Sequence, residues 1–196
     1  MKSINKNIYF FFYSLPAFAL AMPTIPALIY LPTIYASSIG LATTGFILLL
    51  ARALDVFSDP VIGYLSDNKQ TRFGRRKPWI FIGSIISGVS LVFLFNPPNE
   101  ATIAFLFIWV ISLYLGWTMI SVPYVAWGAE LSSNYNERSK ITGMREALTI
   151  FGILVAGTIP VLLSSFGIEE NTGLMLVVWG TILFGAIGIS VLLKYV

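Results

Sequence analysis

The sequence predicts an all-α membrane protein with six transmembrane helices. Of its 196 residues, 57% are hydrophobic and 11% are charged, whereas soluble domains carry about 25% charged residues. The apolar residues gather in segments that are each long enough to cross about 30 Å of hydrocarbon. The basic residues gather in alternate connections between those segments. These three observations together indicate a multi-pass membrane protein.

The apolar segments define one six-helix transmembrane bundle over residues 1–196, with helices expected at 8–35, 42–66, 78–96, 101–131, 141–165 and 173–195. Six spans place both termini on the same side of the membrane. The basic residues of the termini and connections fall on that side, namely Lys2, Lys6, Lys69, Arg72, Arg75, Arg76, Lys77, Arg138, Lys140 and Lys194. Short loops rich in Lys and Arg stay in the cytoplasm. We therefore expect cytoplasmic termini and insertion in the cytoplasmic (inner) membrane.

The composition also argues against several functions. The chain has no cysteine and no histidine, so it lacks the thiolate nucleophile, the usual general base and the usual metal ligands. The net charge of +3 comes from loops beside membrane spans, where basic residues set orientation rather than bind nucleic acid. We predict a non-enzyme without a cofactor that works among membrane lipids.

The first segment is rich in proline, with Pro16, Pro23, Pro26 and Pro32. Each proline removes a helical hydrogen bond, and in a membrane the freed carbonyl needs a neighbouring helix or water. Such a segment can bend and line a cavity. Irregular packing alone is the alternative interpretation.

The second segment carries three ionisable residues, Arg52, Asp55 and Asp59, at spacings that put them on one helical stripe. Lipid disfavours each of these charges, so the stripe must face water, a bound ion or another charge. One arginine offsets only one of the two carboxylates, and a bound proton or cation would offset the other. Pro60 also leaves the carbonyl of Val56 without a helical partner. We predict a cation site; a structural Arg–Asp pair that locks two helices is the alternative.

Three other segments carry small residues at helical spacing. The third has Gly83 and Ser87, the fifth has Gly152 and Ala156, and the sixth has Gly180, Gly185 and Gly188. Small residues four positions apart let transmembrane helices approach closely. We interpret all of them as packing faces.

The fourth segment has a polar stripe of Tyr114, Thr118 and Ser121, with Trp117 and Tyr124 beside it. Hydroxyl groups bind the hydroxyls of a ligand, and aromatic rings stack on its apolar faces. The stripe therefore suits a small hydroxyl-rich ligand such as a sugar. Hydrogen bonds between helices, together with an interfacial aromatic, are the alternative.

Charged residues follow the fourth segment in two pairs. We expect Glu137 and Arg138 in a cytoplasmic loop, and Arg145 and Glu146 near the start of the fifth span. They are interpreted either as a gate of salt bridges or as solvated loop charges.

The stretch GYLSDNKQTRFGRRKPWI at residues 63–80 resembles the loop between the second and third helices of the major facilitator superfamily. The DxxxDP that starts at Asp55 and the KPW that starts at Lys77 narrow this resemblance to the glycoside–pentoside–hexuronide:cation symporter family, the melibiose permease-like branch. YSLPAF, VPY and ERSKITGMREAL also fit the family. The resemblance covers the whole chain.

The resemblance implies symport of a sugar or glycoside with Na⁺ or H⁺. It assigns the cation site to Asp55, Asp59 and Thr118, with Na⁺ on the two aspartates in a sodium-coupled protein. Arg52 matches an arginine beside that site, and Arg145 matches a fifth-helix arginine associated with sugar binding. These two arginines join the fourth-segment stripe as candidate substrate-binding residues, and the full set is Arg52, Tyr114, Trp117, Ser121, Tyr124 and Arg145. Ser121 stands where galactoside-binding members have aspartate, so the substrate stays open among sugars, glycosides and uronides.

The family has twelve helices in two six-helix halves with substrate between them. The chain resembles the N-terminal half, so its expected partner is a second half, either a C-terminal half of a longer protein or a second copy. We expect a cytoplasmic gate at the loop after the second helix, made by Asp67, Arg72, Arg75 and Arg76. A lipid or lysolipid transporter on the same scaffold and a non-transporting membrane subunit are the competing functions.

Overall fold

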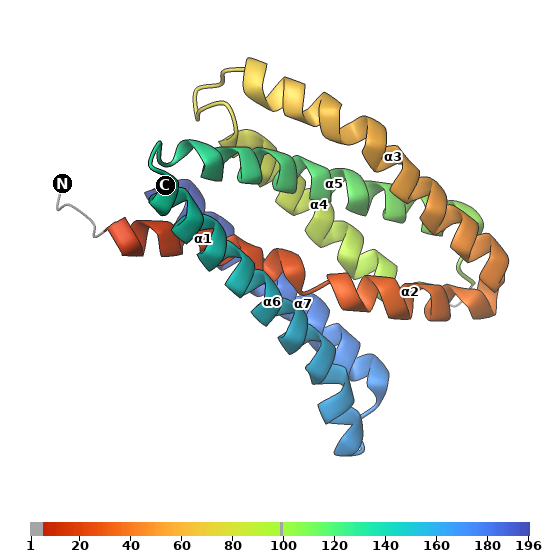
Figure 1. The fold of residues 1–196 in the computed structure, drawn as a ribbon. Coiled ribbons are helices and arrows are strands. Elements are labelled where there is room, and N and C mark those ends of the chain that lie inside the picture. Colours follow the sequence, from red (N-terminus) through yellow and green to blue (C-terminus); the bar gives the residue numbers. More distant parts are fainter. Residues whose placement is uncertain (1–5, 99) are drawn as a thin grey trace. The chain divides into compact units, whose positions relative to one another are not determined.

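The structure is a computed structural model that describes residues 6–98 and 100–196. This part of the chain consists of helices and connections without a β-strand, which confirms the predicted all-α class (Figure 1). Lys2, which entered the topology prediction, lies outside the described residues. The helices are α1 Lys6–Ala21, α2 Thr24–Ile39, α3 Leu41–Asn68, α4 Lys77–Phe95, α5 Ile103–Glu130, α6 Tyr135–Ser165 and α7 Glu170–Tyr195.

Six stretches of the described chain are long and apolar enough to cross a membrane, judged by length and composition. Helices α1 and α2 together make the first stretch, Lys6–Ile39, and α3 to α7 make the other five. The six predicted spans are thereby confirmed as membrane-spanning candidates.

The first span is broken, whereas the sequence predicted one helix over 8–35. Helix α1 ends at Ala21 and α2 begins at Thr24. Pro23 and Pro26 lack the N–H groups that would continue the helical ladder across this point. Helical bonding resumes where the backbone N–H of Ala27 donates to the carbonyl of Pro23 at 2.8 Å.

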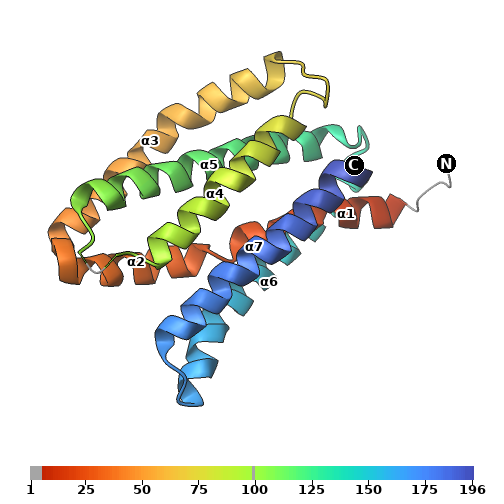
Figure 2. The same ribbon diagram turned by 180° about the vertical axis from the view of Figure 1, so that it is seen from behind.

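The chain forms two compact units, each described here by itself. The first, called the end unit, contains Met1–Ala27 and Gly128–Val196, and the second, called the middle unit, contains Leu28–Trp127. In the end unit, α1, α6 and α7 pack on one another (Figures 1 and 2). Their shared core contains Met22, Ala156 and Val177, with Phe18 packed against it.

Glycines allow the close contacts of the end unit. A Cβ at Gly152 on α6 would overlap the carbonyl oxygen of Phe18 on α1, and a Cβ at Gly188 on α7 would lie 3.1 Å from the backbone of Pro16. Gly180 faces Met22 in the same way, at 3.3 Å. The small residues of the fifth and sixth spans therefore form helix-packing faces, as predicted.

The middle unit packs α4 tightly on α5. A Cβ at Gly83 would lie 2.7 Å from the carbonyl oxygen of Gly116, so the predicted packing face of the third span is confirmed. Nearer the other end of α4, Phe93 stacks on Trp109 with ring centroids 4.2 Å apart. Helix α2 joins α4 through the Tyr35 hydroxyl, which donates to the carbonyl of Leu94 at 3.1 Å.

The first and last helices of the end unit are antiparallel. The rings of Phe12 on α1 and Tyr195 on α7 lie 5.4 Å apart. The start of α1 therefore lies beside the end of α7, which is the arrangement that an even number of spans requires.

Candidate functional site

The ionisable stripe lies on α3, in the middle unit. Asp55 is half-buried, whereas Arg52 and Asp59 are exposed. Helix α3 continues through Pro60 to Asn68, so the carbonyl of Val56 stays within the helix but has no N–H partner at residue 60. The stripe therefore offers two carboxylates and one carbonyl without its usual helical partner, along less than two turns of helix.

A direct contact joins α3 to α5 at this stripe. The hydroxyl of Thr118 donates to Oδ1 of Asp59 at 2.9 Å. Thr118 is 1% exposed, so its hydroxyl is fixed between the helices. The structure thus brings together two residues that lie far apart in the sequence and that were both predicted for the cation site.

Asp55 lines an open cleft of about 310 Å³ between α3 and α5. The wall is almost entirely apolar, although Ser58 of α3 and Tyr114 of α5 are among the residues that line it. Asp55 is the one carboxylate among the residues that line the cleft. The polar atoms of these residues therefore contribute little of the surface of the cleft.

The donor atoms of this region are all oxygens. They comprise the carboxylates of Asp55 and Asp59, the hydroxyl of Thr118 and the carbonyl of Val56. Such a set suits a hard cation or a proton rather than a transition metal. Among the described residues, no three His, Cys, Asp or Glu side chains gather as a metal site.

Arg52 does not lock this region through an ion pair. Within the described residues, no nitrogen of Arg52 lies within 4.0 Å of a carboxylate oxygen of Asp55 or Asp59. All three side chains also belong to α3. The helix-locking pair considered from the sequence is therefore not formed here.

The other residues of the α5 stripe differ in accessibility. Tyr114, Trp117 and Ser121 are half-buried, whereas Tyr124 is buried at 3% exposure. Of these four, Tyr114 lies in the cleft wall beside Asp55. The structure therefore joins one aromatic of the predicted sugar stripe to the predicted cation stripe.

Arg145 lies on α6, in the end unit. Its Nε and Nη2 donate to Oε1 of Glu146 at 3.1 and 2.7 Å. Tyr13 of α1, which is buried in the same unit with its hydroxyl against Gly128, was not singled out from the sequence as a site residue; the YSLPAF motif was its one signal.

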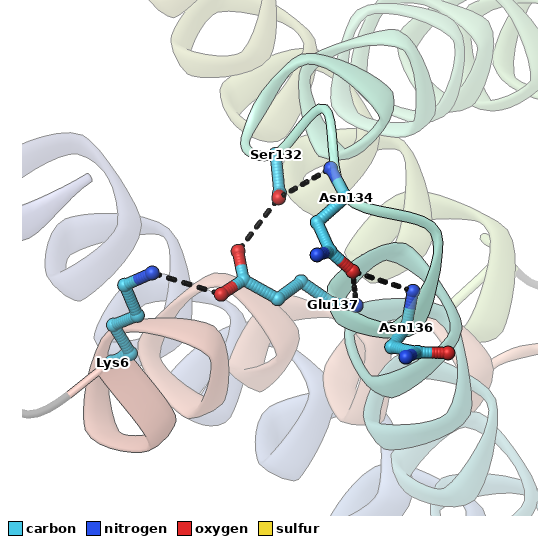
Figure 3. Close-up of polar contacts among 5 residues, drawn as sticks. All are labelled: Lys6, Ser132, Asn134, Asn136 and Glu137. Carbon is cyan, nitrogen blue, oxygen red and sulfur yellow. Dashed lines mark hydrogen bonds and ion pairs between the residues drawn. The ribbon is translucent and has the colours of Figure 1, made fainter.

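The start of α6 corrects one prediction. Glu137 and Arg138 lie in the first turn of this helix rather than in a loop. Asn134 caps the helix, because its side-chain oxygen accepts from the backbone N–H groups of Asn136 and Glu137 at 2.8 and 3.4 Å (Figure 3). An asparagine at this position begins a helix earlier than hydropathy alone indicates.

Glu137 ties the start of α6 to two other segments. Its carboxylate accepts from Lys6 at the start of α1 at 2.8 Å and from the Ser132 hydroxyl at 2.6 Å (Figure 3). Lys6 is 77% exposed, so the ion pair itself contributes little stability. The contacts nevertheless show where the N-terminal end of α1 lies, which is beside the α5–α6 connection.

The loop after α3 holds the gate candidates. Arg76 donates to Asp67 at 2.9 Å, and the Arg76 side chain is 7% exposed. Arg72 is exposed and Arg75 is half-buried. Lys77 lies over the ring of Trp127 at 5.3 Å, which holds the end of this loop against the C-terminal end of α5. Of the four candidates, Asp67 and Arg76 are thus joined directly.

Comparison with known proteins adds a family to this geometry. Residues 12–194 match the family described as MFS/sugar transport protein. An uncharacterized symporter of Synechocystis sp. is 30% identical over 138 residues, which are 66% of this chain and 25% of that protein. An isoprimeverose transporter of Lactiplantibacillus pentosus is 29% identical over 164 residues, which are 80% of this chain and 34% of that protein. A lactose permease of Lactobacillus helveticus is 31% identical over 121 residues, which are 58% of this chain and 19% of that protein.

The chain matches only a minor part of the length of each of these relatives. The matched regions account for between about a fifth and a third of the relatives' lengths. The chain is therefore similar to one part of each relative.

Proposed function

Because the chain belongs to the MFS/sugar transport protein family, we propose that it supplies the N-terminal half of a cation-coupled symporter for a sugar or glycoside. The family is one of transporters rather than enzymes, and the chain is a multi-pass protein of the cytoplasmic membrane. We propose that no cofactor takes part apart from the coupling ion, Na⁺ or H⁺, and that nucleic acid is not a partner.

The observation that carries the proposal is the contact between Thr118 and Asp59 beside the cleft that Asp55 lines. Two carboxylates and one hydroxyl in an apolar helix pair leave negative charge that a cation would neutralise. The site therefore holds the coupling ion, with Asp55, Asp59 and Thr118 as its ligands. Transport of cation and substrate together follows when each favours the same conformation.

The substrate class rests on the relatives. Two of them are named an isoprimeverose transporter and a lactose permease, which supports a carbohydrate substrate. Hydroxyl, aromatic and guanidinium groups suit a sugar. We assign its contacts to Arg52, Tyr114, Trp117, Ser121, Tyr124 and Arg145.

A second six-helix half completes the proposed transporter. The stripe on α3 carries charges that lipid disfavours, and a facing half would give them a water-filled cavity. Either a C-terminal half or a second copy of this chain can supply that cavity. Mass measurement of the purified protein in detergent distinguishes one long chain from a pair of copies.

The proposal is tested by uptake into proteoliposomes that contain the complete protein. We expect uptake of radiolabelled isoprimeverose or lactose to rise when a sodium or proton gradient is imposed. A gradient-independent uptake of lysolipid instead would favour the lipid transporter. Vesicles that take up neither sugar nor lysolipid would contradict transport and support a non-transporting subunit.

The orientation of the chain is a second test. The segment from Asp67 to Lys77 contains five basic residues, Lys69, Arg72, Arg75, Arg76 and Lys77, so it should lie in the cytoplasm. The gate that we assign to Asp67, Arg72, Arg75 and Arg76 also requires this side. Gln70→Cys should react with a membrane-impermeant maleimide in inverted vesicles only. Labelling in intact cells would overturn both the topology and the cytoplasmic gate.

A further inference from the structure

The connection between α3 and α4 contains a hydrogen-bonded turn, and it projects beyond the end of α3 in both views (Figures 1 and 2). The backbone N–H of Gly74 donates to the carbonyl of Thr71 at 3.0 Å. The Thr71 hydroxyl accepts from the backbone N–H of Phe73 at 3.3 Å and donates to the carbonyl of Gly74 at 2.5 Å. Gly74 has a φ of +99°, which residues with a side chain rarely adopt. Arg72 and Phe73 are therefore held as the two apex residues of a four-residue turn.

The apex carries an exposed aromatic ring. The Phe73 side chain is 77% exposed, and it lies outside the apolar spans, which end at Asn68 and resume at Lys77. A single exposed aromatic is ordinary on a soluble surface, but this ring is fixed a few residues from a membrane span. Phenylalanine beside a membrane gains by entering the boundary between headgroups and acyl chains.

The same connection is strongly basic. Residues 69–77 contain five basic side chains and no acidic one. Arg76 is engaged with Asp67 at 2.9 Å. Lys69 and Arg72 are exposed, and within the described part of the chain neither belongs to an ion pair. Positive charge is therefore available on both sides of the turn.

The exposed charges and the exposed ring favour the same partner. Water alone would solvate Lys69 and Arg72, and loop charges also set orientation, but neither effect favours an exposed Phe73. Clusters of basic residues next to a transmembrane helix attract anionic lipids. A membrane surface offers phosphate groups to the cations and an apolar boundary to the ring, so it fits both features.

We propose that the turn at residues 71–74, together with Lys69, docks on anionic phospholipid headgroups, with the Phe73 ring inserted at the headgroup boundary. This lipid contact is additional to the proposed transport of a sugar. It gives the basic connection an occupant of stated chemistry, a negatively charged lipid surface. Arg72 is also assigned to the proposed gate, so the variants below leave it unchanged.

The test places a fluorescent probe at the apex. The chain has no cysteine, so Phe73→Cys gives it a single thiol for an NBD fluorophore, whose apolar ring takes the place of the phenyl group. The purified protein is placed in nanodiscs of phosphatidylcholine, alone or mixed with phosphatidylglycerol. With phosphatidylglycerol, the emission should shift to shorter wavelength and be quenched by brominated acyl chains. The matched probe at Gln70→Cys, which precedes the turn, should keep the emission of a probe in water.

The contribution of charge is measured in the same labelled protein. Lys69→Gln should raise the fraction of phosphatidylglycerol needed for half of the shift by about fivefold, the factor that corresponds to about 1 kcal/mol for one basic residue at an anionic surface. Gln70→Ala, which changes the next residue without changing the charge, should leave that fraction unaltered. Salt at about 1 M should weaken the shift, because the Debye length then falls to about 3 Å.

Several results would overturn the proposal. Water-like emission at position 73 in the anionic discs would exclude insertion, and an equal shift at position 70 would exclude a role for the apex. An equal shift in phosphatidylcholine alone, or an unaltered half-point in Lys69→Gln, would exclude recognition of charge. A shift caused by inorganic phosphate in phosphatidylcholine discs would show a site for a free anion instead of a lipid surface. The discs present the lipid on both faces, so the result holds for either orientation and needs no sugar uptake.

Discussion

Asp59→Cys abolishes the stimulation of uptake by a cation gradient, while the complete transporter still binds its sugar. This is the expected result because the substitution removes a ligand charge and the acceptor of the Thr118 hydroxyl, but leaves the proposed sugar contacts in place. Reciprocal coupling between two ligands is typically about 1–3 kcal/mol, or about 5- to 150-fold in affinity. In the unchanged transporter, the sugar affinities with and without sodium, or at two pH values, should differ by this factor. In Asp59→Cys the two affinities should be equal.

Asp55→Cys should behave in the same way, because both carboxylates belong to one site. The double variant should be little worse than either single variant, since members of one site act non-additively. Gly45→Cys is the matched control: it places the same thiol on α3 at a position where a Cβ meets no atom within 4 Å. Normal cation stimulation in the double variant would mean that the coupling site lies elsewhere.

The membrane fold could be predicted from the sequence because its signals are local. A bilayer requires long apolar segments, and each can be recognised without knowledge of its neighbours. The same holds for the α3 stripe, since a spacing of three and four residues puts Arg52, Asp55 and Asp59 on one side of any helix.

Contacts between helices could be predicted only where the family resemblance supplied them. Thr118 was placed beside the cation site by resemblance, and its hydrogen bond to Asp59 matches that placement. Tyr13 belongs to the YSLPAF motif of that resemblance, but nothing in the sequence linked it to Gly128. Their contact depends on how α1 and the end of α5 pack, which hydropathy and spacing do not specify.

Two boundaries were also misjudged, for a related reason. The break after Ala21 follows from prolines, which membrane helices often tolerate without breaking. The early start of α6 follows from the side-chain cap of Asn134, whereas the sequence prediction used apolar length. Both are decided by individual backbone hydrogen bonds rather than by average hydropathy.

Gly152→Ala should destabilise the end unit by about 1–3 kcal/mol, the usual range for added methyl groups in a filled core. The added Cβ would overlap the carbonyl oxygen of Phe18 and lie 3.2 Å from Cβ of Ala21. Backbone atoms of α1 cannot rotate away, so α1 and α6 must separate and lose contacts around Met22 and Ala156. Thermal unfolding in detergent, followed by intrinsic tryptophan fluorescence, should show a lower midpoint.

Gly143→Ala provides the matched control, because Gly143 lies on the same helix and a Cβ there meets no atom within 4 Å. Alanine is a better helix former than glycine by about 1 kcal/mol, so this variant should unfold at an equal or higher temperature. Comparing the two variants separates the effect of the contact with Phe18 from the effect of replacing glycine by alanine in a helix. Equal unfolding midpoints for Gly152→Ala and Gly143→Ala would contradict the close approach of Gly152 on α6 to the backbone of Phe18 on α1.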